Sequence, residues 1–418
     1  MMETETNVFK RISDTLKDRN KYISANRPED LWTYELQNQY YGDLLTARDR
    51  ERPVVWINAG TTPELFHAMD IFTVSPETLS SIQAGFPGGI EKYLDNAQNF
   101  VPDHICGVNK GMIGSALAGD LPLPDAIVHS SHPCDSGLSS FGTLAEYLKI
   151  PHFCIDTPYT HNERSYRYLA NEMEQMVLFL EEHTGKKLSD VRLLEVAKNS
   201  NTAQSYLSRI NDLRKNVPCP SSTSSLLMNG ALCSSLSGTT GLVYYLRKQY
   251  EIAKAAVEGG KGDPTREKIR LAWIFTPVLF DIGIFRWMEK KFGAFVAMDL
   301  LSHFGSDPID ISNRESIFIG VAKRLTRMPM GHLASGHVDT YSDFSVEICR
   351  DYKADAAIFS GNVACKHAWA TIKLVKDRLK DELDIPTLTF DLDFVDPRVK
   401  SSAAIRSHIE DFFSTMLN

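Results

Sequence analysis

Two cysteines at equivalent places in an internal repeat are the residues of this chain best suited to metal chemistry. Cys134 closes the segment DAIVHSSHPC, and Cys365 closes the similar segment DAAIFSGNVAC. In both segments an acidic residue, a short apolar run and small polar residues precede the cysteine. Cysteine thiolates bind zinc and iron–sulfur clusters. If the two segments belong to two similar half-domains, both thiols could face one cleft.

A third candidate ligand, Cys106, lies in the glycine-rich segment PDHICGVNKGMIG. Together with the first two cysteines and one histidine, it could bind a zinc ion, and His132 and His367 each lie two residues from a cysteine. The spacing lacks the close cysteine pairs of most structural zinc modules. Three thiolates and one open position also suit a cubane iron–sulfur cluster that binds substrate at its fourth iron. These residues alone leave both metals open.

The four remaining cysteines are expected to serve packing rather than chemistry. They are Cys154, Cys219, Cys233 and Cys349. Cys219 and Cys233 lie beside or within a serine-rich segment, residues 220–238, which we expect to be a loop and a helix cap. The total of seven is odd, and the first residues do not resemble an export signal, so a disulfide framework is not expected.

The repeat continues beyond each cysteine as an amphipathic stretch and a second apolar strand, so that Ile150-Pro151 matches Ile385-Pro386. The order strand, turn, helix, strand is typical of a parallel sheet covered by helices. Ligands of such sheets bind beyond the carboxyl ends of the strands, where Cys134 and Cys365 fall. The strands that we expect are Val54–Ile57, Ala126–His129, Leu271–Phe275, Phe295–Met298 and Ala356–Phe359.

Between the two halves the sequence changes to Leu, Glu, Lys and Tyr at helical spacing. Residues 162–183 and 191–216 each predict a long amphipathic helix. The segment GGKGDP, residues 259–264, marks a boundary before the second half. The sequence therefore predicts an α/β domain in residues 1–160, a helical insertion in residues 161–265 and a second α/β domain in residues 266–418. We expect both α/β domains to be Rossmann-like, of the flavodoxin type, with parallel sheets.

Charge and hydropathy exclude several classes of protein. Lys and Arg total 45 against 53 Asp and Glu, a net charge of −8 without a basic block, so a nucleic-acid groove is not expected. The longest apolar stretch, Leu271–Met288, contains Pro277, Asp281 and Arg286, which are costly in a membrane. The sequence has no Walker A motif, so this chain is not expected to hydrolyse ATP. We expect a cytoplasmic protein that does not enter a membrane.

A carboxylate follows the first predicted strand, in the segment INAGTTPELFHAMDIFTV. Thr61 or Thr62 could cap a helix that has Pro63 in its first position and Glu64 near its positively polarised end. That explanation is complete without a function. Carboxylates beyond strand ends also serve as acids and bases in active sites, so Glu64 is equally a candidate catalytic residue.

Several of these segments, taken in order, resemble a known family. They are TTPELFHAMDI, DHICGVNKGMIG, SSHPCD, SGNVACKHAW and TLTFDLDFVDPRVKSSAAIRSHIEDFF, and together they span nearly the whole chain. They resemble the D-component subunits of 2-hydroxyacyl-CoA dehydratases and the related cluster subunits of ATP-dependent benzoyl-CoA reductases. No single segment is as specific as a paired-cysteine signature, whereas their common order and spacing are specific.

The resemblance implies that Cys106, Cys134 and Cys365 bind one 4Fe-4S cluster in the cleft between the α/β domains. It implies a lyase, more narrowly a hydro-lyase, that removes water from an (R)-2-hydroxyacyl-CoA through a ketyl radical to give the enoyl-CoA in an anaerobic, oxygen-sensitive reaction. Glu64 is then the candidate acid or base, and Thr61 a candidate substrate contact. The implied partners are a second homologous cluster subunit, giving a heterodimer, and a separate ATP-dependent activator that donates electrons.

Three alternatives stay open beside this hypothesis. The segment around Cys106 and the ending FVDPR also resemble the benzoyl-CoA reductase branch, whose subunits deliver electrons to an aromatic acyl-CoA. The residues KHAW after Cys365 resemble the dehydratases more. The cysteines could also hold zinc for structure alone, or the chain could position a cluster as an electron relay for its partner.

Overall fold

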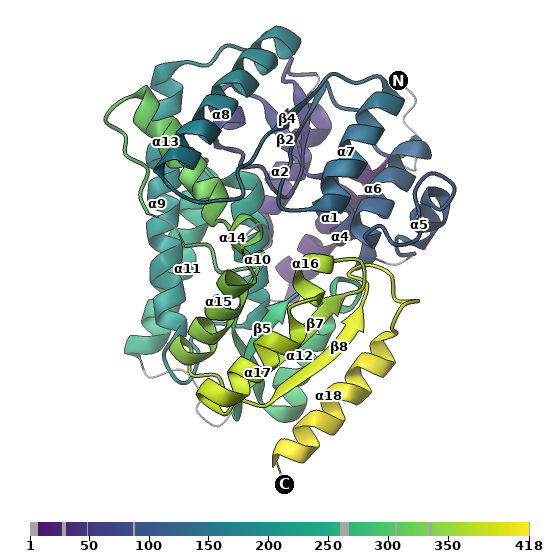
Figure 1. The fold of residues 1–418 in the computed structure, drawn as a ribbon, viewed down its shortest axis with the longest axis vertical. Helices are drawn as coiled ribbons and strands as arrows, with labels where there is room; N and C mark the ends of the chain where they lie inside the picture. The colour runs from purple at the N-terminus through teal and green to yellow at the C-terminus, as the bar shows by residue number, and fades with distance from the viewer. Residues whose placement is uncertain are drawn as a thin grey trace.

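Two sheets of parallel strands form the framework of the protein. The computed structural model describes residues 7–26, 31–47, 49–86, 88–259, 267–305, 307–333 and 337–417. Sheet A has the strand order β2-β1-β3-β4 and sheet B the order β6-β5-β7-β8, with all neighbouring strands parallel. Figure 1 shows sheet A in the upper part of the molecule and sheet B in the lower part. The predicted α/β class with two parallel sheets is confirmed.

All five strands predicted from the sequence are present. Sheet A consists of β1 (Val54–Ile57), β2 (Phe72–Val74), β3 (Ala126–Ser130) and β4 (His152–Ile155). Sheet B consists of β5 (Ile269–Phe275), β6 (Ala294–Asp299), β7 (Ala356–Asn362) and β8 (Thr387–Leu392). The strand order reverses beside β1 and β5. The carboxyl ends of β1, β3, β5 and β7 are therefore where a ligand site is expected.

The internal repeat corresponds to matching hydrogen bonds in the two sheets. Asp125 precedes β3, and its carboxylate accepts a hydrogen bond from the first N–H of β1 at 2.8 Å. Asp355 precedes β7, and its carboxylate accepts one from an N–H at the start of β5 at 2.7 Å. The carbonyls of Pro151 and Pro386 likewise accept from backbone N–H groups of β3 and β7. The two segments are thus equivalent in structure as well as in sequence.

Helices cover both faces of each sheet. One face of sheet A packs against α1, α2 and α4 to α7, and the other against α3, α8, α9 and α13. Sheet B packs against α12, α15, α17 and α18. The bounds are α1 (Val8–Asn26), α2 (Trp32–Thr46), α3 (Glu64–Ala68), α4 (Pro76–Ala84), α5 (Glu91–Ala97), α6 (Gly107–Leu117), α7 (Asp135–Leu148), α8 (Glu163–Thr184), α9 (Asp190–Arg214), α10 (Thr223–Leu236), α11 (Thr240–Glu258), the 3-10 helix η2 (Leu279–Asp281), α12 (Gly283–Phe292), α13 (Arg314–Arg327), α14 (Pro329–Leu333), α15 (Val338–Asp351), α16 (Lys366–Trp369), α17 (Ile372–Leu383) and α18 (Ser402–Leu417).

Four long helices lie between the two sheets in the sequence. Helices α8 and α9 confirm the two amphipathic helices that the sequence predicts. The prediction of a loop at residues 220–238 is wrong, because most of that segment forms α10. Ser222 does cap this helix, since its hydroxyl accepts from Ser225 N–H at 3.3 Å. The buried side chains of Leu226, Leu232 and Leu236 then outweigh the weak helix preference of the serines.

One helix of the second half of the chain packs beside sheet A. Helix α13 lies against α8 and α9, as Figure 1 shows. The division into residues 1–160, 161–265 and 266–418 stays a prediction. The expected boundary GGKGDP falls largely on residues 260–266, which lie outside the described residues.

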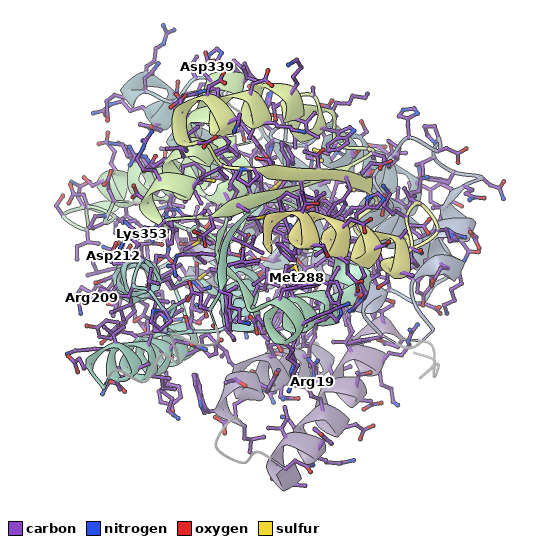
Figure 2. All side chains as sticks on the ribbon, turned by 90° about the horizontal axis from the view of Figure 1, so that it is seen from below. Arg19, Arg209, Asp212, Met288, Asp339 and Lys353 are labelled. Carbon is purple, nitrogen blue, oxygen red and sulfur yellow. The ribbon has the colours of Figure 1, made fainter. Side chains whose placement is uncertain are left out.

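Charged side chains extend outward from the fold. In Figure 2, Arg209, Asp212 and Lys353 lie at one edge of the molecule, whereas Met288 lies in the interior. Of the helices in the described ranges, none combines the length and the apolar character that crossing a membrane requires.

Candidate metal centre

The three predicted ligand cysteines each stand at the start of a helix. Cys134 follows β3 and is the N-cap of α7, and Cys365 follows β7 and is the N-cap of α16. Cys106 is the N-cap of α6. A helix N-terminus presents free N–H groups and a partial positive charge. Each of these positions therefore stabilises a negatively charged sulfur.

Burial is the main influence on the acidity of the three thiols. It raises the pKa of Cys134 to about 12, and it also raises the pKa values of Cys106 and Cys365 above the usual thiol range. Hydrogen bonds from N–H groups in the first turns of α6, α7 and α16 act in the opposite direction, and the one from Gly137 N–H to Cys134 Sγ is 3.2 Å long. The free thiols are protonated at neutral pH, so a metal must displace their protons to bind.

The thiol of Cys134 lies close enough to each of the other two for their charges to interact. Besides burial and the charge of Asp393, a charge on Cys134 raises the pKa of Cys106. Besides burial and the charge of Glu77, a charge on Cys365 raises the pKa of Cys134. The structure therefore brings together one cysteine from the end of β3, one from the end of β7 and one from the loop before α6.

Direct contacts across the two halves of the chain hold these loops together. Asn362, at the end of β7, donates from Nδ2 to Cys106 Sγ at 3.2 Å. The first N–H of α6 donates to Asp393 Oδ2, just after β8, at 2.9 Å. His367 Nε2 lies 3.6 Å from Oδ1 of Asp135, which follows Cys134 in the chain. Both sheets thus contribute to the same small region.

The three thiols can be compared with what a single metal ion and an iron–sulfur cluster each require. A zinc ion needs all its ligand atoms about 2.0 to 2.3 Å from one point. Across the part of the chain that the structure describes, no group of three His, Cys, Asp or Glu side chains is placed to hold one ion. A 4Fe-4S cluster binds each thiolate at a different iron, so its ligands stand farther apart. Three thiols at helix N-termini could supply such ligands, and a cluster held by three cysteines would have one iron without a protein ligand.

Glu77, in the first turn of α4, is a buried carboxylate beside Cys134 that the sequence analysis did not identify. Burial raises its pKa to about 7, while hydrogen bonds from Ala59 N–H, at 2.7 Å, and from the Asn109 side chain oppose that shift. In the sequence Glu77 belongs to SPET, an ordinary helix start, in which acidic residues are common. Only the tertiary contacts distinguish it from a capping residue.

Thr61 and Glu64 lie in the loop after β1 but have different surroundings. Thr61 Oγ1 donates to Asn58 Oδ1 at 2.8 Å. Glu64 is 1% exposed, accepts a hydrogen bond from Ser200 Oγ at 2.7 Å, and lies 3.7 Å from Nη1 of Arg324. Among the described residues no hydrogen bond or ion pair joins Glu64 to the three cysteines.

The expected cap of the helix after β1 is wrong by one residue. Helix α3 begins at Glu64, and its N-cap is Pro63, which makes no side-chain cap. The two threonines have other partners, because Thr61 binds Asn58 and Thr62 donates its hydroxyl hydrogen bond to Glu64. The loop is thus held by its own side chains rather than by capping.

A small cavity of about 30 Å³ lies beside Glu64. Thr61, Cys233, Phe304 and Arg324 are among its lining residues, so the two predicted non-cysteine site residues share one cavity. Burial raises the pKa of Cys233 to about 12. Cys233, expected to serve packing alone, therefore lies in the wall of the space next to Glu64 as a neutral thiol.

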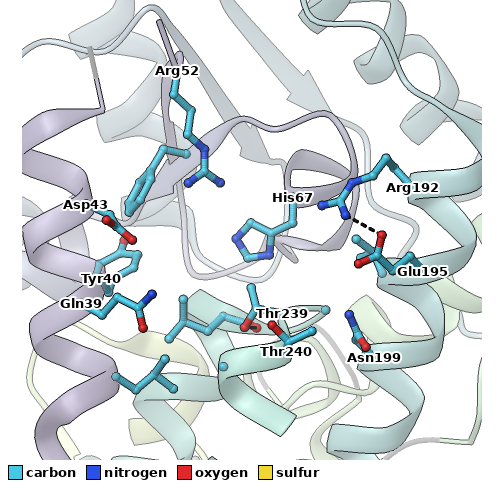
Figure 3. Close-up of a pocket in the computed structure, with 16 residues that line it drawn as sticks. Gln39, Tyr40, Asp43, Arg52, His67, Arg192, Glu195, Asn199, Thr239 and Thr240 are labelled. Atoms are coloured by element: carbon cyan, nitrogen blue, oxygen red, sulfur yellow. Dashed lines mark hydrogen bonds and ion pairs between the residues drawn. The ribbon is translucent and has the colours of Figure 1, made fainter. Parts of the chain in front are cut away.

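A cavity of about 280 Å³, with His67 of α3 among its lining residues, is shown in Figure 3. Arg52, His67, Arg192 and Thr239 line it, and none of the predicted site residues does. Burial lowers the pKa of His67 to about 4, so its ring is neutral and donates from Nδ1 to the carbonyl of Ser237 at 2.9 Å. Cavity size alone therefore does not point to the cysteines.

Comparison with known proteins agrees with the resemblance seen in the sequence. Residues 59–416 match the model of the family described as 2-hydroxyglutaryl-CoA dehydratase, D-component. The (R)-phenyllactyl-CoA dehydratase alpha subunit of Clostridium sporogenes is 23% identical over 96% of this chain and 98% of its own length. The (R)-2-hydroxyisocaproyl-CoA dehydratase alpha subunit of Clostridioides difficile is 22% identical over 91% and 94%. A benzoyl-CoA reductase subunit of Thauera aromatica is 24% identical over 88% and 89%.

Proposed function

The chain belongs to the 2-hydroxyglutaryl-CoA dehydratase D-component family, and we propose that it is the iron–sulfur subunit of an enzyme that removes water from an (R)-2-hydroxyacyl-CoA. The family and most of these relatives are dehydratases, which are hydro-lyases. The observation that carries the proposal is that Cys106, Cys134 and Cys365 each stand at a helix N-terminus, and that contacts between the two halves of the chain join their loops.

In this proposal the three cysteine thiolates hold one 4Fe-4S cluster. When bound, such a cluster supplies an iron without a protein ligand that can polarise the thioester carbonyl, together with the capacity to carry one electron. The residues around the three cysteines provide the surroundings that such a cluster needs. The helix N-termini stabilise the thiolates, and the buried surroundings keep water away from them.

Glu64 is the proposed acid or base, and Thr61 the proposed substrate contact. Dehydration removes a hydroxyl group from C2 and a proton from C3, so a group that accepts or delivers a proton is required. The carboxylate of Glu64 is held by Ser200 and Arg324 at the edge of the small cavity that Thr61 also lines. A water molecule or a small end group of a substrate that enters this cavity would meet both side chains.

The proposed partners follow from the relatives and from the chain itself. The dehydratase relatives are named alpha subunits, and the reductase relative is also named as one subunit of its enzyme, which supports a second subunit here too. We propose a homologous cluster subunit in a heterodimer and a separate ATP-dependent activator as electron donor. The absence of a Walker A motif from the sequence is in keeping with an activator on another chain. We place the protein in the cytoplasm.

The first test is iron and sulfide analysis, with a visible spectrum, of the full chain purified without oxygen. We expect about four iron and four sulfide per chain. Zinc in place of iron, or metal-free protein after careful protection from air, would overturn the proposal. Zinc would support the structural alternative.

The second step distinguishes the branches of the family. The complex with partner and activator is assayed for enoyl-CoA formed from phenyl-substituted, branched and short (R)-2-hydroxyacyl-CoA thioesters. Turnover of benzoyl-CoA alone would support the reductase alternative. If neither kind of thioester perturbs the EPR spectrum of the reduced cluster, the electron-relay alternative is supported instead.

A further inference from the structure

Asn362 connects two of the three ligand cysteines. It is the last residue of β7 and is completely buried. Its backbone carbonyl accepts a hydrogen bond from Cys365 N–H at 2.9 Å, which fixes the turn that presents Cys365. Its side chain reaches Cys106, which comes from the other half of the chain. One residue therefore touches a ligand loop from each half.

The orientation of the Asn362 amide is determined by its neighbours. Asn362 Oδ1 accepts a hydrogen bond from Ala364 N–H at 3.0 Å. An N–H can only donate, so the oxygen of the amide must face Ala364 and the NH₂ group must face the other side. On that side lies Cys106 Sγ, 3.2 Å from Nδ2. The contact is therefore an N–H···S hydrogen bond, and the assignment of nitrogen and oxygen in the amide is not arbitrary.

Asp393 prevents the Cys106 loop from moving away from this donor. Its Oδ2 accepts a hydrogen bond from Gly107 N–H at 2.9 Å, and its Oδ1 accepts from Val395 N–H at 3.0 Å and Asp396 N–H at 3.1 Å. A Cβ atom at Gly107 would collide with the Asp393 carboxylate, so this close approach requires glycine. The first N–H of α6 is thus capped by an aspartate from the opposite half of the chain.

We propose that Asn362 is a positioning residue for the cluster, and this inference rests on the proposed function. It holds the Cys106 sulfur in place from the opposite domain and raises the reduction potential of the cluster by donating a hydrogen bond to that sulfur. Reduction adds negative charge to the cluster and its sulfurs, and an N–H dipole directed at a sulfur stabilises that charge. The effect is strong here because the amide is buried in a medium of low dielectric constant.

The test is an EPR-monitored reductive titration of the full chain carrying its cluster. We expect Asn362→Leu to lower the midpoint potential and Asn362→Asp to lower it further, because aspartate replaces the donor with a carboxylate oxygen. Asn211→Leu is the matched control, since Asn211 is a buried asparagine on α9 whose Oδ1 lacks a hydrogen-bond partner within the described ranges. Its midpoint should equal that of the wild type.

A second readout identifies the hydrogen bond itself. Electron–nuclear double resonance spectra of the reduced cluster are compared in H₂O and in D₂O. One proton coupling that disappears in D₂O should be present in the wild type and in Asn211→Leu. The same coupling should be missing from Asn362→Leu. If Asn362→Leu fails to retain iron, Asn362→Asp, which keeps the shape of the side chain, gives the same comparison.

The outcomes separate this inference from the proposal on which it rests. Wild-type protein without a cluster would overturn both. A wild-type cluster whose midpoint and proton couplings are unchanged in the iron-containing Asn362 variants would overturn the role of Asn362 alone.

Discussion

In both halves of the molecule, a polar side chain just beyond the first central strand forms a hydrogen bond to the backbone of the second, although the donor and acceptor differ. In sheet A, Asn58 at the end of β1 accepts a hydrogen bond from Ser130 N–H at the end of β3, at 3.2 Å. In sheet B, Thr276 beyond β5 donates from its hydroxyl to the carbonyl of Ser360 in β7 at 3.0 Å. Beyond each pair of strands stands one ligand cysteine at the start of a helix. The repeat therefore explains the placement of two of the proposed ligands and the frame that presents them.

The halves differ in what they add to this frame. The N-terminal half inserts the loop with Cys106 between β2 and β3, and it places Glu64 after β1. The corresponding connection between β6 and β7 contains Cys349, which is buried within α15, and the segment after β5 forms η2 and α12. The C-terminal half instead supplies Asn362 and Asp393, which hold the Cys106 loop. One half thus carries most of the proposed chemistry, and the other half fixes its geometry.

The largest expected effect concerns the ligands themselves. We expect most of the iron to be lost in each of three variants, because each removes one of the three thiolates. Two of them, Cys134→Ser and Cys365→Ser, change the cysteines of the repeat. The third, Cys106→Ser, changes the cysteine that has no counterpart in the repeat. The measurement is iron content after purification without oxygen. Cys219→Ser and Cys233→Ser are matched controls that should keep their iron. Equal iron in all five variants would show that the cluster does not lie at these cysteines.

Glu64 tests whether the chemistry resides in the N-terminal half. We expect Glu64→Gln to lower kcat by about 10²- to 10⁴-fold, the usual contribution of an acid or base, with the cluster intact. Asp281, which follows β5 and pairs with Arg406 at 2.7 Å, occupies the comparable segment of the other half. Asp281→Asn should leave kcat nearly unchanged. Equal losses in the two variants would indicate that Glu64 acts through stability rather than through proton transfer.

The sequence predicted the frame far better than the contacts between its parts. Strands such as Val54–Ile57 and the long helices α8 and α9 follow from local apolar patterns, which carry the information about secondary structure. Strand β2 was missed because three residues are too few to show a period, and α10 was missed because tertiary packing overrides the turn preference of serine.

The candidate site was predictable only where a residue type is rare. Three cysteines stand out in a sequence and belong to segments that resemble a family, whereas Asn362 and Asp393 are ordinary polar residues whose partners lie about 250 to 290 positions away in the chain. Glu77 is hidden in the same way within a helix start. Asn362 does belong to SGNVAC, a segment that the sequence analysis singled out for its cysteine. Its role depends on how the two halves meet, which no local pattern encodes.

Two buried groups, one beside each sheet, should make stability depend on pH in opposite directions. Burial lowers the pKa of His67, beside sheet A, from 6.5 to about 4, an effect that the nearby Arg52 and Arg192 increase and Glu64 opposes. Unfolded chains bind a proton at His67 below pH 6.5 while the native protein does not, so this group lowers stability as the pH falls from 6.5 to 4. The full effect is about 3 kcal/mol. His67→Asn should weaken the loss of stability in acid.

The opposite sign is expected at Asp299, at the end of β6 in sheet B. Burial raises the pKa of this carboxyl from 3.8 to about 6, so the native protein keeps its proton after the unfolded chain has lost it. Stability from this group is complete below pH 3.8 and is lost as the pH rises through 6, again by about 3 kcal/mol. Urea midpoints between pH 4 and 7 for the wild type, His67→Asn and Asp299→Asn measure both effects. Parallel pH profiles in all three proteins would contradict these assignments.

The smallest expected effect is the most direct test of the repeat. Asp125→Asn and Asp355→Asn each weaken one hydrogen bond from a carboxylate to the backbone of the neighbouring strand, and both residues are exposed, so each should cost about 1 kcal/mol of unfolding free energy. Asp411→Asn, an exposed change on α18, is the control and should cost nothing measurable. Because the two bonds occupy equivalent places, the shifts in the urea midpoint should agree within error. A large loss of unfolding free energy in only one of the two variants would mean that the equivalent hydrogen bonds do not contribute equally to stability. The halves would then have diverged in stability as well as in chemistry.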